Sequence, residues 1–304
     1  MKPNILITGG SGLLGVNFSI YLRDKYNIFA TYNNKLIKIN NIKFKKINFL
    51  STDSLIESLK NINPLFIIHC AALSNVDYCE KNKKIAFQIN VKITENISIS
   101  CIKLKIKLVY ISTDHLFDGR SKMLNEDHPK KFLNYYSQTK SLAEEIILKF
   151  NKDYLIIRTN FFGWGTSYRK SFSDRIIDNL RANKEIHLFN DVYFTPILMK
   201  ELFDKIHNLT LKDKKGIYNI VGNERISKYT FGMIIANIFS LNSDLIEPIS
   251  INSIRNLSSR PYDMSLSNMK YCTELNDTFL SLEKSFEYLK KIENDKVTKE
   301  ILCL

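Results

Sequence analysis

The glycine-rich segment ITGGSGLLG, residues 7–15, constrains the fold of this chain more than any other feature. It follows the short apolar run NILIT and leads into a stretch of helical periodicity. Its glycines allow a tight turn, and the helix behind it offers N–H groups and a positive dipole end to an anion. In this strand–turn–helix context the segment predicts a cradle for a dinucleotide pyrophosphate. The candidate cradle residues are Gly9, Ser11, Gly12, Leu13, Leu14 and Gly15.

Short apolar runs alternate with helix-like stretches along the first half of the chain. The predicted strands are NILITGG, IFATY, FKKINF, LFIIHCAA, KLVYIST, YLIIRTN and, later, GIYNIV. The predicted helices cover residues 12–25, 52–61, 84–104 and 136–150. Apolar strands that alternate with helices form parallel sheets covered on both faces. We therefore expect an α/β fold with a Rossmann-type doubly wound parallel sheet.

The alternation loosens beyond residue 163, which predicts a second part. We expect residues 1–163 to form a dinucleotide-binding Rossmann domain, to which residues 193–222 return. Residues 164–190 and 223–304 read as a smaller, mainly helical, substrate-binding lobe. Such a lobe can close over the carboxyl ends of the strands, where doubly wound sheets bind their ligands.

Composition excludes several classes of protein. No apolar run reaches the roughly 18 to 20 residues that span a bilayer, and the start lacks a signal-peptide pattern, so we expect a cytoplasmic protein without membrane contact. The five cysteines are scattered, which indicates reduced thiols and no metal cluster. The net charge of +13 comes from dispersed lysines rather than a basic block. It favours small anionic ligands over nucleic acid.

The end of the second predicted strand bears on the choice of dinucleotide. An acidic residue there would hydrogen-bond the ribose hydroxyls of NAD. The sequence instead reads TYNNK, which has no carboxylate and ends in Lys35. Because a lysine can meet a 2′-phosphate, we expect NADP(H). NAD(H) stays open, since Lys35 can equally be one more solvated lysine.

Later segments complete a recognisable order of motifs. LFIIHCAAL ends a strand with Ala71, Ala72 and Leu73, where small side chains let a cofactor lie close to the backbone. KLVYISTDHLFDG ends another with Thr113 and Asp114, predicted substrate contacts, and NYYSQTK adds a Tyr-x-x-x-Lys. This order resembles the extended short-chain dehydrogenase/reductases. STDHLFDG, VDYCE and RPYDMSLSNMK narrow the resemblance to the dTDP-4-dehydrorhamnose reductase family, the nucleotide-sugar 4-ketoreductases, across essentially the whole chain.

The resemblance implies an NADPH-dependent reduction with Tyr136 as proton donor. Residues four apart share a helix face, whereas Tyr135 is rotated by about 140° from Lys140, so Tyr135 reads as packing. In this family the lysine also hydrogen-bonds the nicotinamide ribose and the threonine holds the substrate oxygen. These roles fall to Lys140 and Thr113. We expect Lys140 and the cofactor's positive charge to lower the pKa of Tyr136.

The resemblance assigns further roles to five residues. Asn48 and Phe49 occupy the place of an Asp–apolar pair that contacts the adenine. Asn90 resembles a polar residue that braces the site beside the cofactor. Phe161 matches a substrate-facing aromatic, with a core Phe as the alternative. Arg260 could meet the substrate diphosphate, with an ordinary surface arginine as the alternative.

Related functions compete with the reductase. The 4,6-dehydratases typically carry Thr-Asp-Glu, but this chain has His115 after Thr113 and Asp114, which argues against dehydration. Nucleotide-sugar epimerases resemble the chain less closely. A non-catalytic NADP-binding regulatory subunit is a different class, and the intact Tyr-x-x-x-Lys argues against it. The sequence leaves open which sugar is the substrate and whether the protein forms a homodimer.

Overall fold

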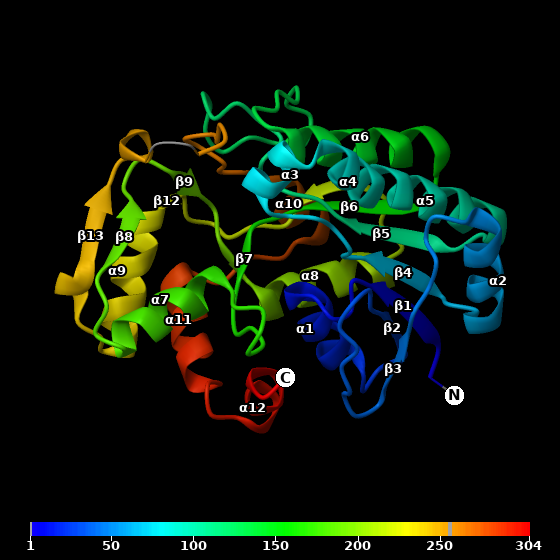
Figure 1. The fold of residues 1–304 in the computed structure, drawn as a ribbon, viewed down its shortest axis with the longest axis horizontal. Helices are drawn as coiled ribbons and strands as arrows, with labels where there is room; N and C mark the ends of the chain where they lie inside the picture. Colours follow the sequence, from blue (N-terminus) through cyan, green and yellow to red (C-terminus); the bar gives the residue numbers. More distant parts are fainter. Residues whose placement is uncertain (1, 255–256) are drawn as a thin grey trace. The chain divides into compact units, whose positions relative to one another are not determined.

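The structure is a computed structural model that describes residues 2–254 and 257–304 (Figure 1). The chain divides into two compact units. The first unit contains residues 1–116, 132–157 and 207–217, and the second contains residues 117–131, 158–206 and 218–304. That the first unit binds a cofactor and the second a substrate stays a prediction.

A seven-stranded sheet forms the centre of the fold, in the order β11-β6-β5-β4-β1-β2-β3. Its strands are β1 (Asn4–Thr8), β2 (Asn27–Thr31), β3 (Ile42–Lys45), β4 (Phe66–His69), β5 (Lys107–Ile111), β6 (Tyr154–Arg158) and β11 (Gly216–Asn219). The pairs from β3 to β6 are parallel. The strand order reverses between β1 and β4, as in Rossmann folds. The predicted fold class is confirmed, although β3 ends at Lys45, inside the predicted strand FKKINF.

Helices cover both faces of this sheet (Figure 1). They are α1 (Leu13–Leu22), α2 (Thr52–Ile62), α3 (Val76–Lys81), α4 (Lys83–Phe87), α5 (Ile93–Leu104), α6 (Tyr135–Phe150) and α8 (Met199–Leu211). A π-helical turn, η1 (Gln88–Lys92), joins α4 to α5 within the predicted helix 84–104. Apolar side chains of α2, α5 and α6 share one core with β1, β4, β5 and β6. Figure 1 shows α1 on the opposite face.

Local sequence sets the limits of these helices, as α2 illustrates. The Ser51 side chain caps its start by accepting a hydrogen bond from the Ser54 N–H. Asp53 lies in the first turn and Lys60 in the last, where each charge opposes the helix dipole. Asn63 ends the helix in a left-handed conformation that asparagine tolerates better than most residues.

The second unit combines helices with short strand pairs. Its helices are α7 (Phe172–Arg181), α9 (Lys228–Phe239), α10 (Met269–Leu275), α11 (Leu282–Lys291) and α12 (Lys296–Leu302), with short 3₁₀ turns η2 (Ser243–Leu245) and η3 (Ile251–Ser253). The pairs join β7 (Phe161–Phe162) to β10 (Ile197–Leu198), β8 (Ile186–Phe189) to β13 (Ile246–Ile249), and β9 (Tyr193–Phe194) to β12 (Ile226–Ser227). The helices were predicted in outline, but the strand pairs were not.

Aromatic side chains form the core of the second unit. The Phe231 ring lies 5.3 Å from those of Phe162 and Phe194 and 5.0 Å from that of Phe286. Each such pair contributes about 0.5 to 1.5 kcal/mol beyond the area it buries. Trp164 is buried in the same core, and its indole N–H donates to the Leu289 carbonyl oxygen at 3.0 Å.

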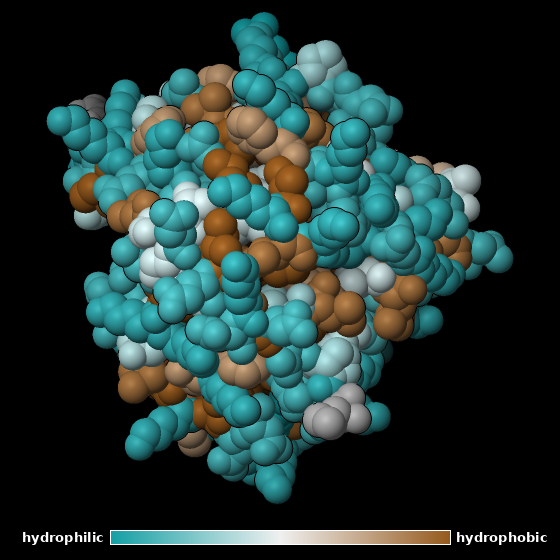
Figure 2. Space-filling view, turned by 90° about the vertical axis from the view of Figure 1, so that its right-hand side faces the viewer, coloured by the Kyte–Doolittle hydropathy of each residue, from teal (hydrophilic) through white to brown (hydrophobic). Residues whose placement is uncertain are grey.

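Hydrophilic residues cover most of the face shown in Figure 2, with apolar residues gathered in smaller patches between them. This agrees with a chain that carries 44 Lys and Arg residues. In the described ranges, no helix is both long and apolar enough to cross a membrane. All five cysteines are free thiols.

Candidate active site

The turn between β1 and α1 depends on its lack of side chains. Gly9 has a φ of 66°, and a Cβ atom there would stand 2.8 Å from the Cα atom of Ala71. A Cβ atom at Gly15 would collide with the Gly9 carbonyl oxygen. Gly12 is the N-cap of α1, which no described side chain caps. The start of α1 is thus left without a side-chain cap behind a turn of glycines, which fits a pyrophosphate. Ser11, Leu13 and Leu14 lie in this turn and at the start of α1.

The predicted adenosine contacts lie beyond the ends of β2 and β3. Lys35 is exposed in the loop after β2. Asn48 is also exposed, and its side-chain oxygen accepts a hydrogen bond from the Leu50 N–H at 3.1 Å. Phe49 packs partly against the core of the first unit, and its carbonyl oxygen accepts from Asn96 at 2.8 Å. Phe49 therefore has a structural contact besides its predicted role.

Asn90 ties the segment after β4 to α6. Its side-chain oxygen accepts from the Leu73 N–H at 2.7 Å, and its amide nitrogen donates to the Leu73 carbonyl oxygen at 3.0 Å. The same nitrogen donates to Thr139 on α6 at 3.0 Å. Ala71 is held in turn, since its N–H donates to the Thr8 hydroxyl at 3.2 Å, whereas Ala72 is exposed. Asn90 thus joins the predicted cofactor segment to the predicted catalytic helix.

Two contacts fix the start of α6. Asn134 and Ser137 form a capping box, in which the Asn134 side chain accepts from the Ser137 N–H at 2.9 Å. The Tyr135 N–H donates to the carboxylate of Glu80 at 2.8 Å, which together with Lys83 lowers the pKa of Glu80. Glu80 ends the motif VDYCE, so this motif holds the helix that carries Tyr136.

Tyr136, on α6, and Thr113, just after β5, are both buried. Burial raises the pKa of Tyr136 well above its ordinary value; the nearby Thr113 hydroxyl opposes this rise and the charge of Asp114 adds to it. Among the protein's own groups, the cost of burying a phenolate dominates the pKa of Tyr136; the lowering expected from the cofactor's positive charge stays a prediction. At neutral pH Tyr136 is a neutral phenol with a proton to give.

Lys140 lies one helical turn beyond Tyr136 and is also buried. Its ammonium group donates to the Ile111 carbonyl oxygen at 2.7 Å, at the end of β5. It also stands 4.1 Å from the centre of the Tyr110 ring, a cation–π contact. Burial lowers the pKa of Lys140 to about 7, and the charge of Glu144 opposes this fall. The ammonium is therefore close to losing its proton near neutral pH.

The two adjacent tyrosines have different surroundings. Tyr136 is 8% exposed and packs with Val76, Cys79 and Ala86. Tyr135 is only partly buried at the edge of that cluster, and its ring lies 5.4 Å from the Lys83 ammonium. Only Tyr136 shares the buried helix face with Lys140, which agrees with the helical-phase argument.

The predicted substrate contacts are divided between the units. Asp114 lies in the first unit, is buried, and accepts a hydrogen bond from Thr113 at 3.3 Å. Phe161 is half-buried in β7 and Arg260 is half-buried before Pro261, both in the second unit. The roles of Asp114, Phe161 and Arg260 toward a substrate stay predictions.

The sequence analysis missed two buried polar residues beneath this site. His69, at the end of β4, contacts the hydroxyls of Thr8 at 2.6 Å and Thr94 at 3.0 Å. Glu144 accepts a hydrogen bond from Ser112 at 2.6 Å. A signal existed for Glu144, since it follows Lys140 by four residues and so lies on the same helix face.

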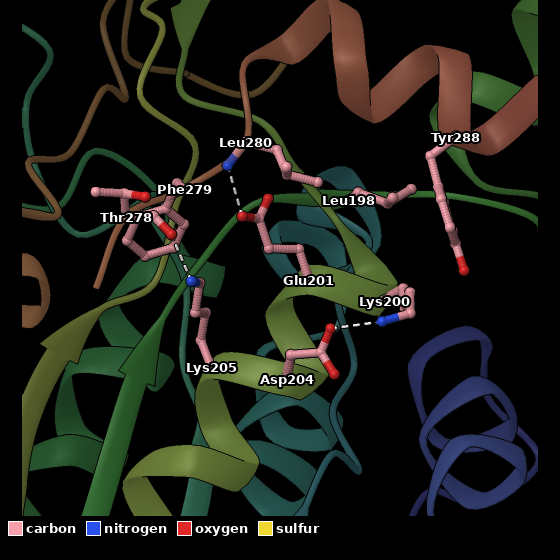
Figure 3. A pocket seen from close by; sticks show the side chains of 9 residues that line it. All are labelled: Leu198, Lys200, Glu201, Asp204, Lys205, Thr278, Phe279, Leu280 and Tyr288. Carbon is pink, nitrogen blue, oxygen red and sulfur yellow. Dashed lines mark hydrogen bonds and ion pairs between the residues drawn. The ribbon is translucent and has the colours of Figure 1, made fainter. Parts of the chain in front are cut away.

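A separate cavity of about 290 Å³ lies within the second unit (Figure 3). Its charged side chains already bond within the protein: Lys200 pairs with Asp204 at 2.7 Å, and Glu201 accepts from the Leu280 N–H at 2.7 Å. None of the predicted site residues lines it, so we do not assign the site to this cavity. No group of three His, Cys, Asp or Glu residues suited to a metal occurs within residues 2–254 and 257–304.

A family model described as the RmlD substrate binding domain matches residues 1–289. This protein belongs to the RmlD family. Its fold agrees with that of another RmlD-type protein, dTDP-4-dehydrorhamnose reductase from Bacillus anthracis in complex with NADP, at a TM-score of 0.84 and 25% identity. That comparison covers 96% of this chain and 99% of the other.

Two relatives of this RmlD-family chain have names that describe different kinds of protein. Methionine adenosyltransferase 2 subunit beta of Xenopus tropicalis is 28% identical over 268 residues, 86% of this chain and 79% of that protein. The probable low-salt glycan biosynthesis reductase Agl14 of Haloferax volcanii is 25% identical over 293 residues, 92% of this chain and 97% of that protein. One name describes a reductase of glycan biosynthesis and the other a subunit of a different enzyme.

Proposed function

We propose that this protein is an NADPH-dependent reductase of a nucleotide-linked 4-keto-6-deoxy sugar. It would resemble dTDP-4-dehydrorhamnose reductase and act in deoxysugar and surface-polysaccharide biosynthesis. The observation that carries the proposal is that Thr113, Tyr136 and Lys140 are all buried, with Lys140 one helical turn beyond Tyr136 on α6. These groups lie beyond the carboxyl end of β5 and along α6, at the sheet edge where doubly wound folds bind ligands.

Each of these residues has a chemical role in the proposed reaction. The bound reduced nicotinamide supplies a hydride to the carbonyl carbon. Tyr136, whose pKa burial keeps high, donates its proton to the carbonyl oxygen, and Thr113 holds that oxygen. The Lys140 charge stabilises the phenolate that remains, and its ammonium binds the nicotinamide ribose. Gly9, Gly12 and Gly15 would hold the pyrophosphate, with Asn48, Phe49 and Ala71 beside the adenosine.

The direct test is a reaction with a panel of nucleotide-linked 4-keto-6-deoxyhexoses. NADPH absorbance should fall in proportion to product, and the product should be two mass units heavier than the substrate, as addition of hydride and proton requires. Tyr136→Phe is the control. Loss of water from the substrate would instead indicate a dehydratase, and an isomer of unchanged mass without NADPH consumption an epimerase.

NADP(H) is the proposed cofactor form because Lys35 follows β2 and no carboxylate stands in TYNNK. Lys35→Glu should weaken binding of NADPH relative to NADH by roughly tenfold, the effect of about 1.4 kcal/mol. Lys25→Glu makes the same charge change before β2, at the opposite edge of the sheet, and should leave the ratio unchanged. Titration of cofactor fluorescence measures both ratios. Equal or better use of NADH by the unaltered protein would refute the preference.

The alternative is a non-catalytic NADP-binding subunit, which the similarity to methionine adenosyltransferase 2 subunit beta favours. The two functions can be distinguished by whether a partner enzyme co-purifies with this protein. A subunit should co-purify from its native cells with a partner enzyme and change that enzyme's activity, with no turnover of any sugar. Stoichiometric oxidation of NADPH would exclude this alternative as the sole function.

A further inference from the structure

Glu144 places a buried carboxylate beside the proposed catalytic lysine. It lies on α6 one helical turn beyond Lys140 and is 0% exposed. The Ser112 hydroxyl donates to its Oε1 atom at 2.6 Å. Ser112 directly follows Ile111, whose carbonyl oxygen accepts from the Lys140 ammonium at 2.7 Å. Adjacent residues at the end of β5 thus bind two charged side chains of α6, Lys140 and Glu144.

The other titratable groups that act on Lys140 are uncharged at neutral pH. Burial, followed by the charge of Lys140, lowers the pKa of His69 to about 3, so this imidazole on β4 is neutral. Burial raises the pKa of Cys70 to about 12 and that of Tyr110 on β5 well above its ordinary value, so both keep their protons. Tyr136 on α6 likewise stays protonated. The side chains that η1 and α5 contribute to this buried region, Asn90 and Thr94, carry no charge.

Glu144 is therefore the negative charge that opposes the desolvation of Lys140. Burial lowers the pKa of Lys140 to about 7, and the Glu144 carboxylate raises it. Without that carboxylate the ammonium would lose its proton at a still lower pH. A neutral Lys140 could no longer stabilise the phenolate left on Tyr136.

We propose that Glu144 is a positioning residue of the reductase site: Ser112 anchors its carboxylate at the end of β5, next to the Ile111 carbonyl that holds Lys140, so that a negative charge stands one helical turn from the Lys140 ammonium. This inference rests on the proposed function, because it concerns the ionisation of the lysine that serves the reaction. Glu144 itself does not touch the substrate in this role.

The pH dependence of kcat/KM tests the charge. The active form has a charged Lys140, so activity is lost as pH rises through the pKa of Lys140. Glu144→Gln keeps the size of the side chain and its ability to accept from Ser112 but removes the charge. Its loss of activity should begin about one pH unit lower than in the unaltered protein. Glu145→Gln makes the same change at the exposed neighbour and should leave the profile unmoved. An unshifted profile for Glu144→Gln overturns the inference.

A double-mutant cycle tests the pair without any turnover. At a pH low enough for Lys140 to stay charged in both proteins, Lys140→Met and Glu144→Gln each leave a buried charge without its counterpart, whereas the double variant leaves neither. The double variant should therefore lose less in its thermal unfolding midpoint than the two single losses added. If Glu144→Gln alone does not fold and the double variant does, that result also supports the inference. Additive losses, or a double variant no more stable than Glu144→Gln, would overturn the inference and leave the proposed reaction untouched.

Discussion

Tyr136 carries the sharpest prediction at the scale of single residues. Tyr136→Phe removes the hydroxyl proton and keeps the ring that packs with Val76, Cys79 and Ala86. Turnover should fall at least about a hundredfold, the lower range of acid–base catalysis, with NADPH affinity nearly unchanged. Steady-state kinetics and cofactor titration measure the two effects.

Tyr135→Phe is the matched control, because it makes the same change one residue earlier at a partly exposed ring. It should alter turnover less than about threefold. A large loss in Tyr135→Phe together with full activity in Tyr136→Phe would move the proton donor to the other tyrosine.

His69 makes the stability of the protein depend on pH. Its folded pKa of about 3 lies below the ordinary value of 6.5, so its contribution is fully present above pH 6.5 and is lost as pH falls toward 3. His69→Gln removes this titration. The unfolding free energy of the variant should fall by roughly 3 kcal/mol less between pH 6.5 and 4 than that of the unaltered protein, in urea titrations. His187→Gln, at an exposed histidine of β8, should leave that pH dependence unchanged.

The site residues that belong to sequence motifs were predicted, whereas buried residues outside those motifs were missed. Helical phase was enough to choose Tyr136 over Tyr135. Burial was not foreseen as the largest influence on its pKa, because the sequence does not reveal how far a phenol is removed from water; the effect of the cofactor's charge stays a prediction. His69 and Glu144 were missed for the same reason: a lone histidine or glutamate has no signal until its neighbours are known. The functional roles of all these residues stay predictions.

At the scale of secondary structure, a substitution of Asn90 tests how the π-helical turn η1 supports the segment after β4. Its buried side chain makes hydrogen bonds to both backbone groups of Leu73 and to Thr139. Asn90→Ala leaves those groups without their partners in the interior. We expect a loss of about 2 to 3 kcal/mol in unfolding free energy, measured in urea, and weaker NADPH binding because Leu73 is released.

Gln88→Ala is the control for this change, because Gln88 begins the same π turn but is exposed. It should cost less than about 0.5 kcal/mol. Equal losses in the two variants would mean that the turn itself, rather than the Asn90 side chain, supports the segment after β4.

The elements that the sequence predicted are those with a strong local period. Strands β1, β4, β5, β6 and β11 lie within predicted runs, and β2 begins one residue before its run, since each is a short apolar segment bounded by helix or turn. The pairs β7–β10 and β9–β12 contain strands of two residues, too short for any period. The π turn was also invisible, because one widened turn hardly disturbs the helical pattern of residues 83–104.

At the scale of the whole molecule, the two units differ in how much the sequence says about them. The first unit has a fold whose topology follows from strand–helix alternation and a glycine turn. The second unit is held by an aromatic core around Phe231 that joins segments far apart in the sequence. Such a core depends on long-range packing, so the sequence predicted a helical lobe but not its strand pairs.

The burial of Trp164 has a practical consequence for measuring this protein. The chain has one tryptophan and 15 tyrosines, and that tryptophan lies in the core of the second unit against Leu289. Selective excitation of the single indole therefore reports the opening of that core alone, by a red shift as water reaches the ring. Under the proposed cofactor assignment, the emission of bound NADPH reports the first unit. Each unit would then carry its own optical reporter, and their unfolding could be followed separately without any label.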